Sequence, residues 1–275
     1  LYSVPWYALV GEPGSGKTSL CDACASRLRS EGVSVAVTRV PEPGTHPPLW
    51  PIARLAHAVL ASRTAEQRRA ICDTMTSSSR SELDHLLSLS LEESGDERHE
   101  PARRAWFTLL ETLKHVILTA AAQGPLVLVT DDAHQLDDSS AHALRDLGGE
   151  LRDSPVAVVA IVREPTGVVR PATRAALDVF ARLHRTRRLE LTPLSRDDIA
   201  ALADQFGLEC GESVFYELHR MTGGNALFVH ELLRGLTHGG CDLDEHYGRL
   251  GVVVDRFVSR LSDADEIGPF IARLR

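Results

Sequence analysis

The sequence contains no run of eighteen apolar residues, so nothing in it predicts a segment that crosses a membrane. Its first residues include neither an initiator methionine nor the basic start and apolar core of a signal peptide. We therefore expect a cytoplasmic protein that does not interact with a membrane. We also expect a piece of a larger protein, because the last residues, Leu274-Arg275, fall within what reads as a continuing helix.

An excess of positive charge is also missing. Lys and Arg number 30 against 38 Asp and Glu, which gives a net charge of −8. This balance argues against a broad surface that grips a nucleic-acid backbone, although it leaves room for a local basic patch. The four arginines between positions 182 and 188 read more easily as a solvated helix end followed by the start of a strand.

The chain has only five cysteines, and their spacing does not predict a metal centre. Cys21 and Cys24 are the only close pair, and no second Cys/His pair stands at a recognisable ligand spacing. We interpret the cysteines as small apolar packing residues in a reducing cytosol.

The apolar pattern predicts an α/β fold. Short buried runs rich in β-branched residues alternate with helical spacings, which favours a parallel sheet with helices on both faces. The predicted strands are 5–10, 33–40, 126–130, 156–162 and 188–191. The predicted helices among them are 17–29, 52–61, 65–75, 81–91, 101–122, 138–152 and 173–183.

After Pro193 the pattern becomes entirely helical, with segments at 195–206, 212–221 and 226–236. We therefore expect a sheet-containing domain over residues 1–192. A small helical domain should follow over residues 193–248, and a third, truncated element over residues 249–275.

The strongest functional motif is a glycine-rich loop that follows an apolar strand and opens a helix. Glycines let the backbone wrap around phosphates with its N–H groups pointing inward, and the helix N-terminus adds a favourable dipole. We predict that Lys17 reaches the β- and γ-phosphates of a nucleoside triphosphate, and that the Thr18 hydroxyl ligates Mg²⁺. The predicted nucleotide-binding residues of this segment are Gly11, Glu12, Pro13, Gly14, Ser15, Gly16, Lys17, Thr18 and Ser19.

Two aspartates end the buried strand at 126–130. In phosphate-loop folds a carboxylate in this position stands beside the bound metal, so Asp131 is the predicted Mg²⁺-side acid, acting through water. Asp132 is the predicted residue that orients or deprotonates the attacking water. The alternative is that both aspartates only cap the turn that follows.

A third predicted site residue is Arg163, which follows the strand 156–162. The carboxyl ends of parallel strands line the ligand crevice, so a guanidinium there would sense the γ-phosphate. The alternative is an exposed loop arginine that pairs with Glu164. His134 either links the acidic turn to the nucleotide or is purely structural.

These segments resemble the signal-transduction ATPases with numerous domains, the STAND class, and most of all the ATPase module of large bacterial LuxR-type regulators and related antibiotic regulatory proteins. The likeness rests on residues 11–20, 126–147, 189–202 and 221–236, and residues 251–261 resemble the first helix of that family's winged-helix portion. It implies the same roles for Lys17, Thr18, Asp131, Asp132 and Arg163. It also implies that Asn225 belongs to a nucleotide-contacting segment, in which the family's usual proline is here Ala226.

The resemblance implies an ATP- or ADP-binding switch with Mg²⁺ and slow hydrolysis. ADP would hold the domains closed, and ATP would permit homo-oligomerisation, or DNA binding through domains outside this chain. ATP is favoured over GTP by the likeness and by the absence of a guanine-reading Asn-Lys-x-Asp segment. The alternatives are a working P-loop ATPase or small-molecule kinase, and a scaffold that binds nucleotide without hydrolysing it.

Overall fold

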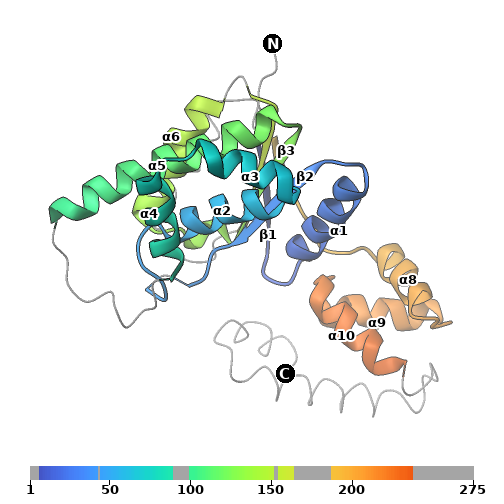
Figure 1. Cartoon of the computed structure of the whole chain (residues 1–275). Coiled ribbons are helices and arrows are strands. Elements are labelled where there is room, and N and C mark those ends of the chain that lie inside the picture. The colour runs from blue at the N-terminus through green and yellow to red at the C-terminus, as the bar shows by residue number, and fades with distance from the viewer. Residues whose placement is uncertain (1–5, 43, 89–98, 152–153, 164–186, 238–275) are drawn as a thin grey trace. The chain divides into compact units, whose positions relative to one another are not determined.

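The computed structural model describes residues 6–42, 44–88, 99–151, 154–163 and 187–237 (Figure 1). The chain divides into two compact units. The first contains residues 1–11 and 17–190, and the second contains residues 12–16 and 191–275. The middle of the glycine-rich loop therefore belongs to the second unit, while both of its ends belong to the first.

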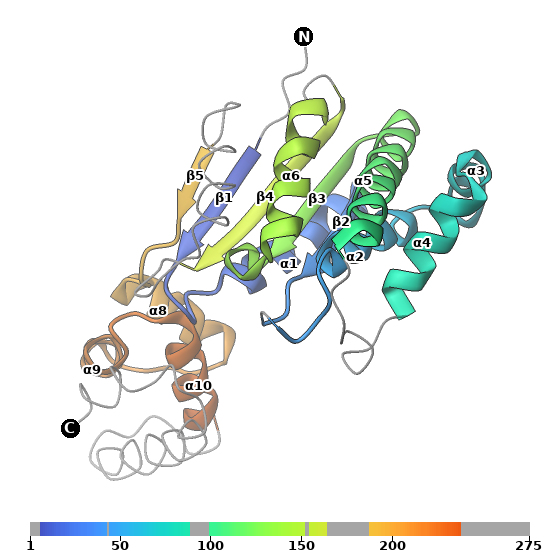
Figure 2. The same cartoon turned by 90° about the vertical axis from the view of Figure 1, so that its left-hand side faces the viewer.

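Five strands of the first unit form one parallel sheet in the order β2-β3-β4-β1-β5 (Figure 2). They are β1 (Trp6–Gly11), β2 (Ser34–Arg39), β3 (Leu126–Asp131), β4 (Val156–Arg163) and β5 (Arg187–Glu190). Because all five run in one direction, their carboxyl ends meet at the same edge of the sheet. The predicted α/β class with a parallel sheet is thereby confirmed.

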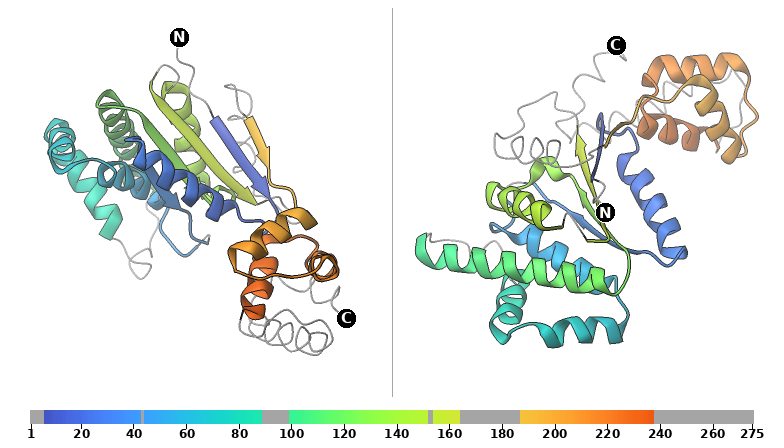
Figure 3. Two further views of the ribbon diagram at one scale, coloured as in Figure 1. Left: turned by 90° about the vertical axis from the view of Figure 1, so that its right-hand side faces the viewer. Right: turned by 90° about the horizontal axis from the view of Figure 1, so that it is seen from above.

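Helices cover both faces of this sheet. Figure 3 shows α1 on one face and α2, α5 and α6 on the opposite face. The described helices of this unit are α1 (Lys17–Ser30), α2 (Trp50–Ala61), α3 (Ala65–Thr74), α4 (Ser77–Ser88), α5 (His99–Ala122) and α6 (Asp138–Glu150), with a 3₁₀ turn η2 (Ala133–Gln135). The main core lies between the sheet and α2, α5 and α6, where Leu128 and Val158 meet Ile52, Leu113 and Leu147.

Side-chain caps set several helix starts in this sequence. Thr64 and Asp137 accept hydrogen bonds from backbone N–H groups in the first turns of α3 and α6, which satisfies donors that have no partner within the helix. Helix α2 begins at Trp50 rather than at the predicted position 52, because Pro51 is tolerated in a first turn. Helix α4 likewise begins at Ser77, four residues before its predicted start.

Residues 191–237, the described part of the second unit after the loop, contain the three helices α8 (Arg196–Gln205), α9 (Glu212–Thr222) and α10 (Ala226–Leu236). They enclose a small core of their own, in which Ile199, Leu218 and Leu233 are fully buried. A capping box starts α8: the Ser195 hydroxyl accepts from the Asp198 backbone N–H, and the Asp198 carboxylate accepts from the Ser195 N–H. The Ser195 hydroxyl also donates to the Asp198 carboxylate at 2.6 Å, and this bond, with that from the Ser195 N–H, lowers the pKa of the Asp198 carboxyl group.

Some predictions lie outside the described residues, among them the helix at 173–183 and the third element at 249–275. One prediction is wrong in part: Cys210 is disulfide-bonded, so it is not simply a packing residue. Cys21, Cys24 and Cys72 are free thiols. Within the described part of the chain, every helix is too short or too polar to cross a membrane.

We expect Gly224→Ala to destabilise the second unit strongly. Gly224 has φ +76°, and a Cβ there would lie 2.4 Å from the backbone oxygen of Leu194. Both the left-handed backbone and the overlap with backbone atoms oppose a side chain, so we expect a loss of about 3 kcal/mol or more. Amide hydrogen exchange of α8 and α10 measures this loss locally.

Gly207→Ala is the matched control, because Gly207 also has a positive φ, +68°, but has open space around its Cβ position. This variant should lose only the free energy needed to hold an alanine in a left-handed backbone conformation, about 1–2 kcal/mol. Equal losses for the two variants would show that the close approach at Gly224 does not matter.

Candidate functional site

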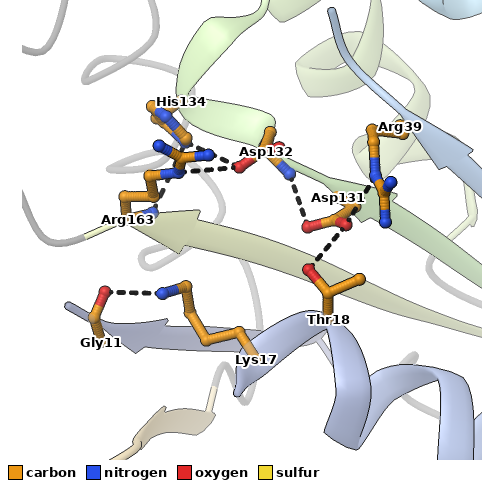
Figure 4. Close-up of polar contacts among 8 residues, drawn as sticks. All are labelled: Gly11, Lys17, Thr18, Arg39, Asp131, Asp132, His134 and Arg163. Carbon is orange, nitrogen blue, oxygen red and sulfur yellow. Dashed lines mark hydrogen bonds and ion pairs between the residues drawn. The ribbon is translucent and has the colours of Figure 1, made fainter. Parts of the chain in front are cut away.

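The glycine-rich loop leaves β1 at Gly11 and enters α1 at Lys17, in the strand–loop–helix context that the motif requires. Gly14 and Gly16 have φ values of 76° and 90°, which residues with a side chain rarely adopt. The Lys17 side chain is buried, and its Nζ donates to the Gly11 carbonyl at 2.9 Å (Figure 4). The first turn of α1 contains no acidic residue, so the helix dipole is available to an anion. Ser19 lies in this turn and is exposed.

Asp131 lies at the carboxyl end of β3, and its side chain is only 3% exposed. Its Oδ1 accepts from the backbone N–H of Asp132 at 2.9 Å. Its Oδ2 accepts from the Thr18 hydroxyl at 3.0 Å and from Nε of Arg39 at 3.1 Å. The structure therefore brings together the two residues that the sequence predicted at the metal, Thr18 and Asp131.

Asp132 adopts a left-handed backbone, with φ 55°, at the start of the turn that follows β3. Its Oδ1 accepts from Nε of Arg163 at 3.2 Å. Arg163 is the last residue of β4 rather than part of the following loop. The predicted water-orienting acid and the predicted phosphate sensor are thus paired with one another across the ends of two neighbouring strands.

His134 stands beside this pair. Its Nδ1 accepts from the backbone N–H of Arg163 at 3.5 Å and lies 4.0 Å from Oδ1 of Asp132. A ring nitrogen that accepts a hydrogen bond carries no proton, so the longer contact is not an ion pair in this arrangement. His134 therefore contacts the acidic turn and the end of β4, which agrees with a structural role.

Cys21 lies on α1, behind the loop. Burial, together with the negative charge of Asp131, raises the pKa of its thiol to about 11. The Cys21 side chain therefore stays protonated and uncharged near neutral pH. Over the described residues, no group of three or more His, Cys, Asp or Glu side chains is arranged to hold a metal ion.

Arg39 is a site residue that the sequence did not reveal. It is the last residue of β2 and stands opposite Asp131 in the register of the β2–β3 pair. Within the sequence it is only one arginine at the end of an apolar run, 92 positions away from Asp131. Knowing that β2 lies beside β3 would have placed it, because parallel neighbours bring their carboxyl ends together.

In the second unit, residues 12–16 of the loop contact the start of α10. Asn225 Nδ2 donates to the Pro13 carbonyl at 2.8 Å, and the Leu227 N–H donates to the Gly14 carbonyl at 2.9 Å. A Cβ at Gly14 would lie 2.6 Å from Oδ1 of Asn225. Because a trans peptide points its C=O and N–H in opposite directions, the bond to Pro13 turns the Gly14 N–H away from Asn225.

Comparison with protein families decides the class of the chain. A family model described as an AAA ATPase domain matches residues 3–159, more than half of the sequence. The chain belongs to the AAA ATPase domain family. Comparison with curated proteins finds no match.

Two solved structures are similar to this AAA ATPase domain at low identity. One is a STAND protein with a tetratricopeptide repeat sensor from Pyrococcus horikoshii: identity is 11%, the TM-score is 0.44, and the match covers 88% of this chain and 28% of that one. The other is a HORMA:CdnC:Trip13 complex from E. coli: identity is 14%, the TM-score is 0.48, and the match covers 92% of this chain and 74% of that one. The chain therefore spans little more than a quarter of the STAND protein's length.

AAA ATPase domains bind ATP or ADP with Mg²⁺, and the residues present fit these ligands. Lys17 and the N-terminus of α1 supply positive potential at the loop. Thr18 offers a hydroxyl as a metal ligand, and Asp131 stands behind it at hydrogen-bond distance. Mg²⁺ commonly keeps several waters and takes few protein ligands in such sites, so this sparse donor set suits it.

We expect Lys17→Ala to weaken ATP binding roughly a hundredfold, because it removes charge-assisted hydrogen bonds to the phosphates. Titration with a fluorescent ATP analogue measures the affinity. Arg27→Ala, which removes an exposed cation elsewhere on α1, is the control and should bind normally. An unchanged affinity in Lys17→Ala would contradict the assignment of the loop.

We expect Asp132→Asn to retain ATP but to slow turnover about a hundredfold or more, because the amide cannot accept a proton from water. Binding and phosphate release are measured on the same sample. A loss of ATP binding instead would place Asp132 among the groups that hold the metal.

Proposed function

We propose that the chain is the nucleotide-dependent switch module of a larger bacterial transcriptional regulator. ATP and ADP bind at the glycine-rich loop, and slow Mg²⁺-dependent hydrolysis resets the module. The exchange of ADP for ATP controls homo-oligomerisation, or DNA binding by other domains of the same parent chain. The regulatory context comes from the sequence likeness to LuxR-type and antibiotic regulatory proteins.

The observation that carries the proposal is the contact between the loop and α10. Pro13 and Gly14, in the middle of the phosphate-binding loop, are hydrogen-bonded by Asn225 and Leu227 at the start of that helix. A phosphate ligand that adjusts the loop backbone therefore changes the hydrogen bonds of α10 as well. Such a contact gives the nucleotide a direct way to bias the packing of the second unit.

A switch also requires that ATP and ADP bind the two arrangements with different affinities, because equal affinities shift nothing. The γ-phosphate is the group that differs between the two nucleotides. Arg163 is the cation proposed to meet it, and its guanidinium is held by Asp132. Moving Arg163 toward a γ-phosphate would break this pair, so only ATP would drive the change.

The same pair supports slow hydrolysis. While Asp132 accepts from Arg163, one of its carboxylate oxygens is occupied and its charge is partly neutralised. That oxygen cannot orient a water while the pair persists, so the pair must open before Asp132 can act on the attacking water. When Mg²⁺ is bound it neutralises phosphate charge. Lys17 and Thr18 position the phosphates, and Asp132 positions the attacking water.

The test compares the wild-type protein bound to ADP with the same protein bound to a non-hydrolysable ATP analogue by amide hydrogen exchange. We expect different protection of the first-turn amides of α10 in the two states, together with wild-type turnover below about one per second, the low end for ordinary enzymes. Identical exchange in both states would contradict the switch. Fast turnover would favour a working ATPase, and stoichiometric phosphorylation of a small molecule would favour a kinase.

Asn225→Ser is the matched variant for this experiment. Serine keeps a helix cap in place of the Asn225 Oδ1···H–N Leu227 contact, but it is too short to bond Pro13 as the amide does. We expect it to bind nucleotide and to lose most of the difference between ADP and ATP in α10. A full difference in this variant would show that the Asn225–Pro13 bond does not transmit the nucleotide state.

A further inference from the structure

Arg39 and Thr18 donate to the same oxygen of Asp131 at nearly equal distances, 3.1 and 3.0 Å. The other oxygen of that carboxylate already accepts the Asp132 N–H. Thr18 and Asp131 are the residues that fit Mg²⁺. Figure 4 shows Arg39 and Thr18 at the same oxygen of this carboxylate, the oxygen that a metal ligated by Thr18 would approach.

The two partners of this ion pair differ greatly in exposure. The Asp131 side chain is 3% exposed, and the Arg39 side chain is 64% exposed. A buried carboxylate needs a compensating charge, because little water reaches it. An exposed arginine can swing into solvent at small cost, because its charge is already hydrated there.

We infer that Arg39 is a displaceable counter-charge for the metal site. It neutralises Asp131 while no divalent cation is present, and it leaves Oδ2 when Mg²⁺ binds with the nucleotide. Arg39 and Mg²⁺ thus compete for one buried negative charge, so Arg39 sets the Mg²⁺ concentration at which nucleotide binding tightens. This inference rests on the proposed nucleotide site and assigns Arg39 a role in its regulation.

Three other groups near Asp131 do not serve as counter-charges that Mg²⁺ could displace from its carboxylate. Lys17 is buried, and its Nζ donates to the Gly11 carbonyl at the end of β1. Arg163 pairs with Asp132. The Cys21 thiol is uncharged because burial raises its pKa to about 11. Arg39 is the cation that the described part of the structure pairs with Asp131.

The experiment measures the affinity of fluorescent ADP at fixed ionic strength, first with EDTA and then over a range of Mg²⁺ concentrations. The readout is the ratio of the affinities with and without Mg²⁺. General damage to the fold lowers both affinities and largely cancels in this ratio. Fixed ionic strength is needed because an exposed ion pair is screened by salt.

For Arg39→Gln we expect weaker binding of ADP in EDTA, because Asp131 then faces the phosphates without compensation. We also expect the Mg²⁺ midpoint to fall roughly five- to tenfold, because the competing charge is gone. Arg39→Lys keeps the charge and should stay within about twofold of the wild type. Arg27→Gln, which removes the same charge from an exposed position of α1, should not change the ratio.

An unchanged ratio in Arg39→Gln, with ADP binding intact, would overturn the inference and leave Arg39 as a clamp between β2 and β3. A ratio that changes equally in Arg27→Gln would also overturn it, because net charge alone would then be the cause. If the wild-type protein bound no ADP at any Mg²⁺ concentration, the proposed function would fail, and the inference with it.

Discussion

The buried carboxylate of Asp131 is the interaction on which the site depends. Its two oxygens receive donors from three elements: the first turn of α1 through Thr18, the end of β2 through Arg39, and the turn after β3 through the Asp132 N–H. Desolvating a carboxylate costs several kcal/mol unless its partners compensate, so the buried Asp131 side chain needs these donors or a cation in their place. The phosphate-loop helix is thereby fixed to the strand edge before any ligand arrives.

This arrangement makes ligand binding an exchange of partners. Lys17 donates to Gly11, Arg163 to Asp132 and Arg39 to Asp131, so three cations near the proposed phosphate and metal positions have protein partners. A nucleotide with Mg²⁺ would replace some of these contacts rather than add to them. Net affinity then depends on small differences between protein and ligand partners, and such differences can distinguish ATP from ADP.

Local signals in the sequence predicted the glycine-rich loop, the strand and helix that flank it and the acidic strand end. Each of these is encoded within about ten residues: glycines where φ is positive, Lys17 and Thr18 at fixed spacing, and Asp131 directly after an apolar run. Helix ends were less predictable, since Pro51 is compatible with both a turn and a first helical turn.

The contacts between distant segments could not be predicted in the same way. The Arg39–Asp131 pair requires the strand order, and the pairing of Asp132 with Arg163 requires the ends of β3 and β4 to be adjacent. The bond from Asn225 to Pro13 joins positions 212 residues apart. Gly14 illustrates the consequence: its positive φ explains a glycine locally, and a Cβ there would also lie 2.6 Å from Oδ1 of Asn225, so a side chain would displace the Asn225 amide. The hydrogen bonds from Asn225 to Pro13 and from Leu227 to Gly14 join the loop that would hold phosphate to the start of α10. The geometry of the loop and the hydrogen bonds of that helix therefore change together.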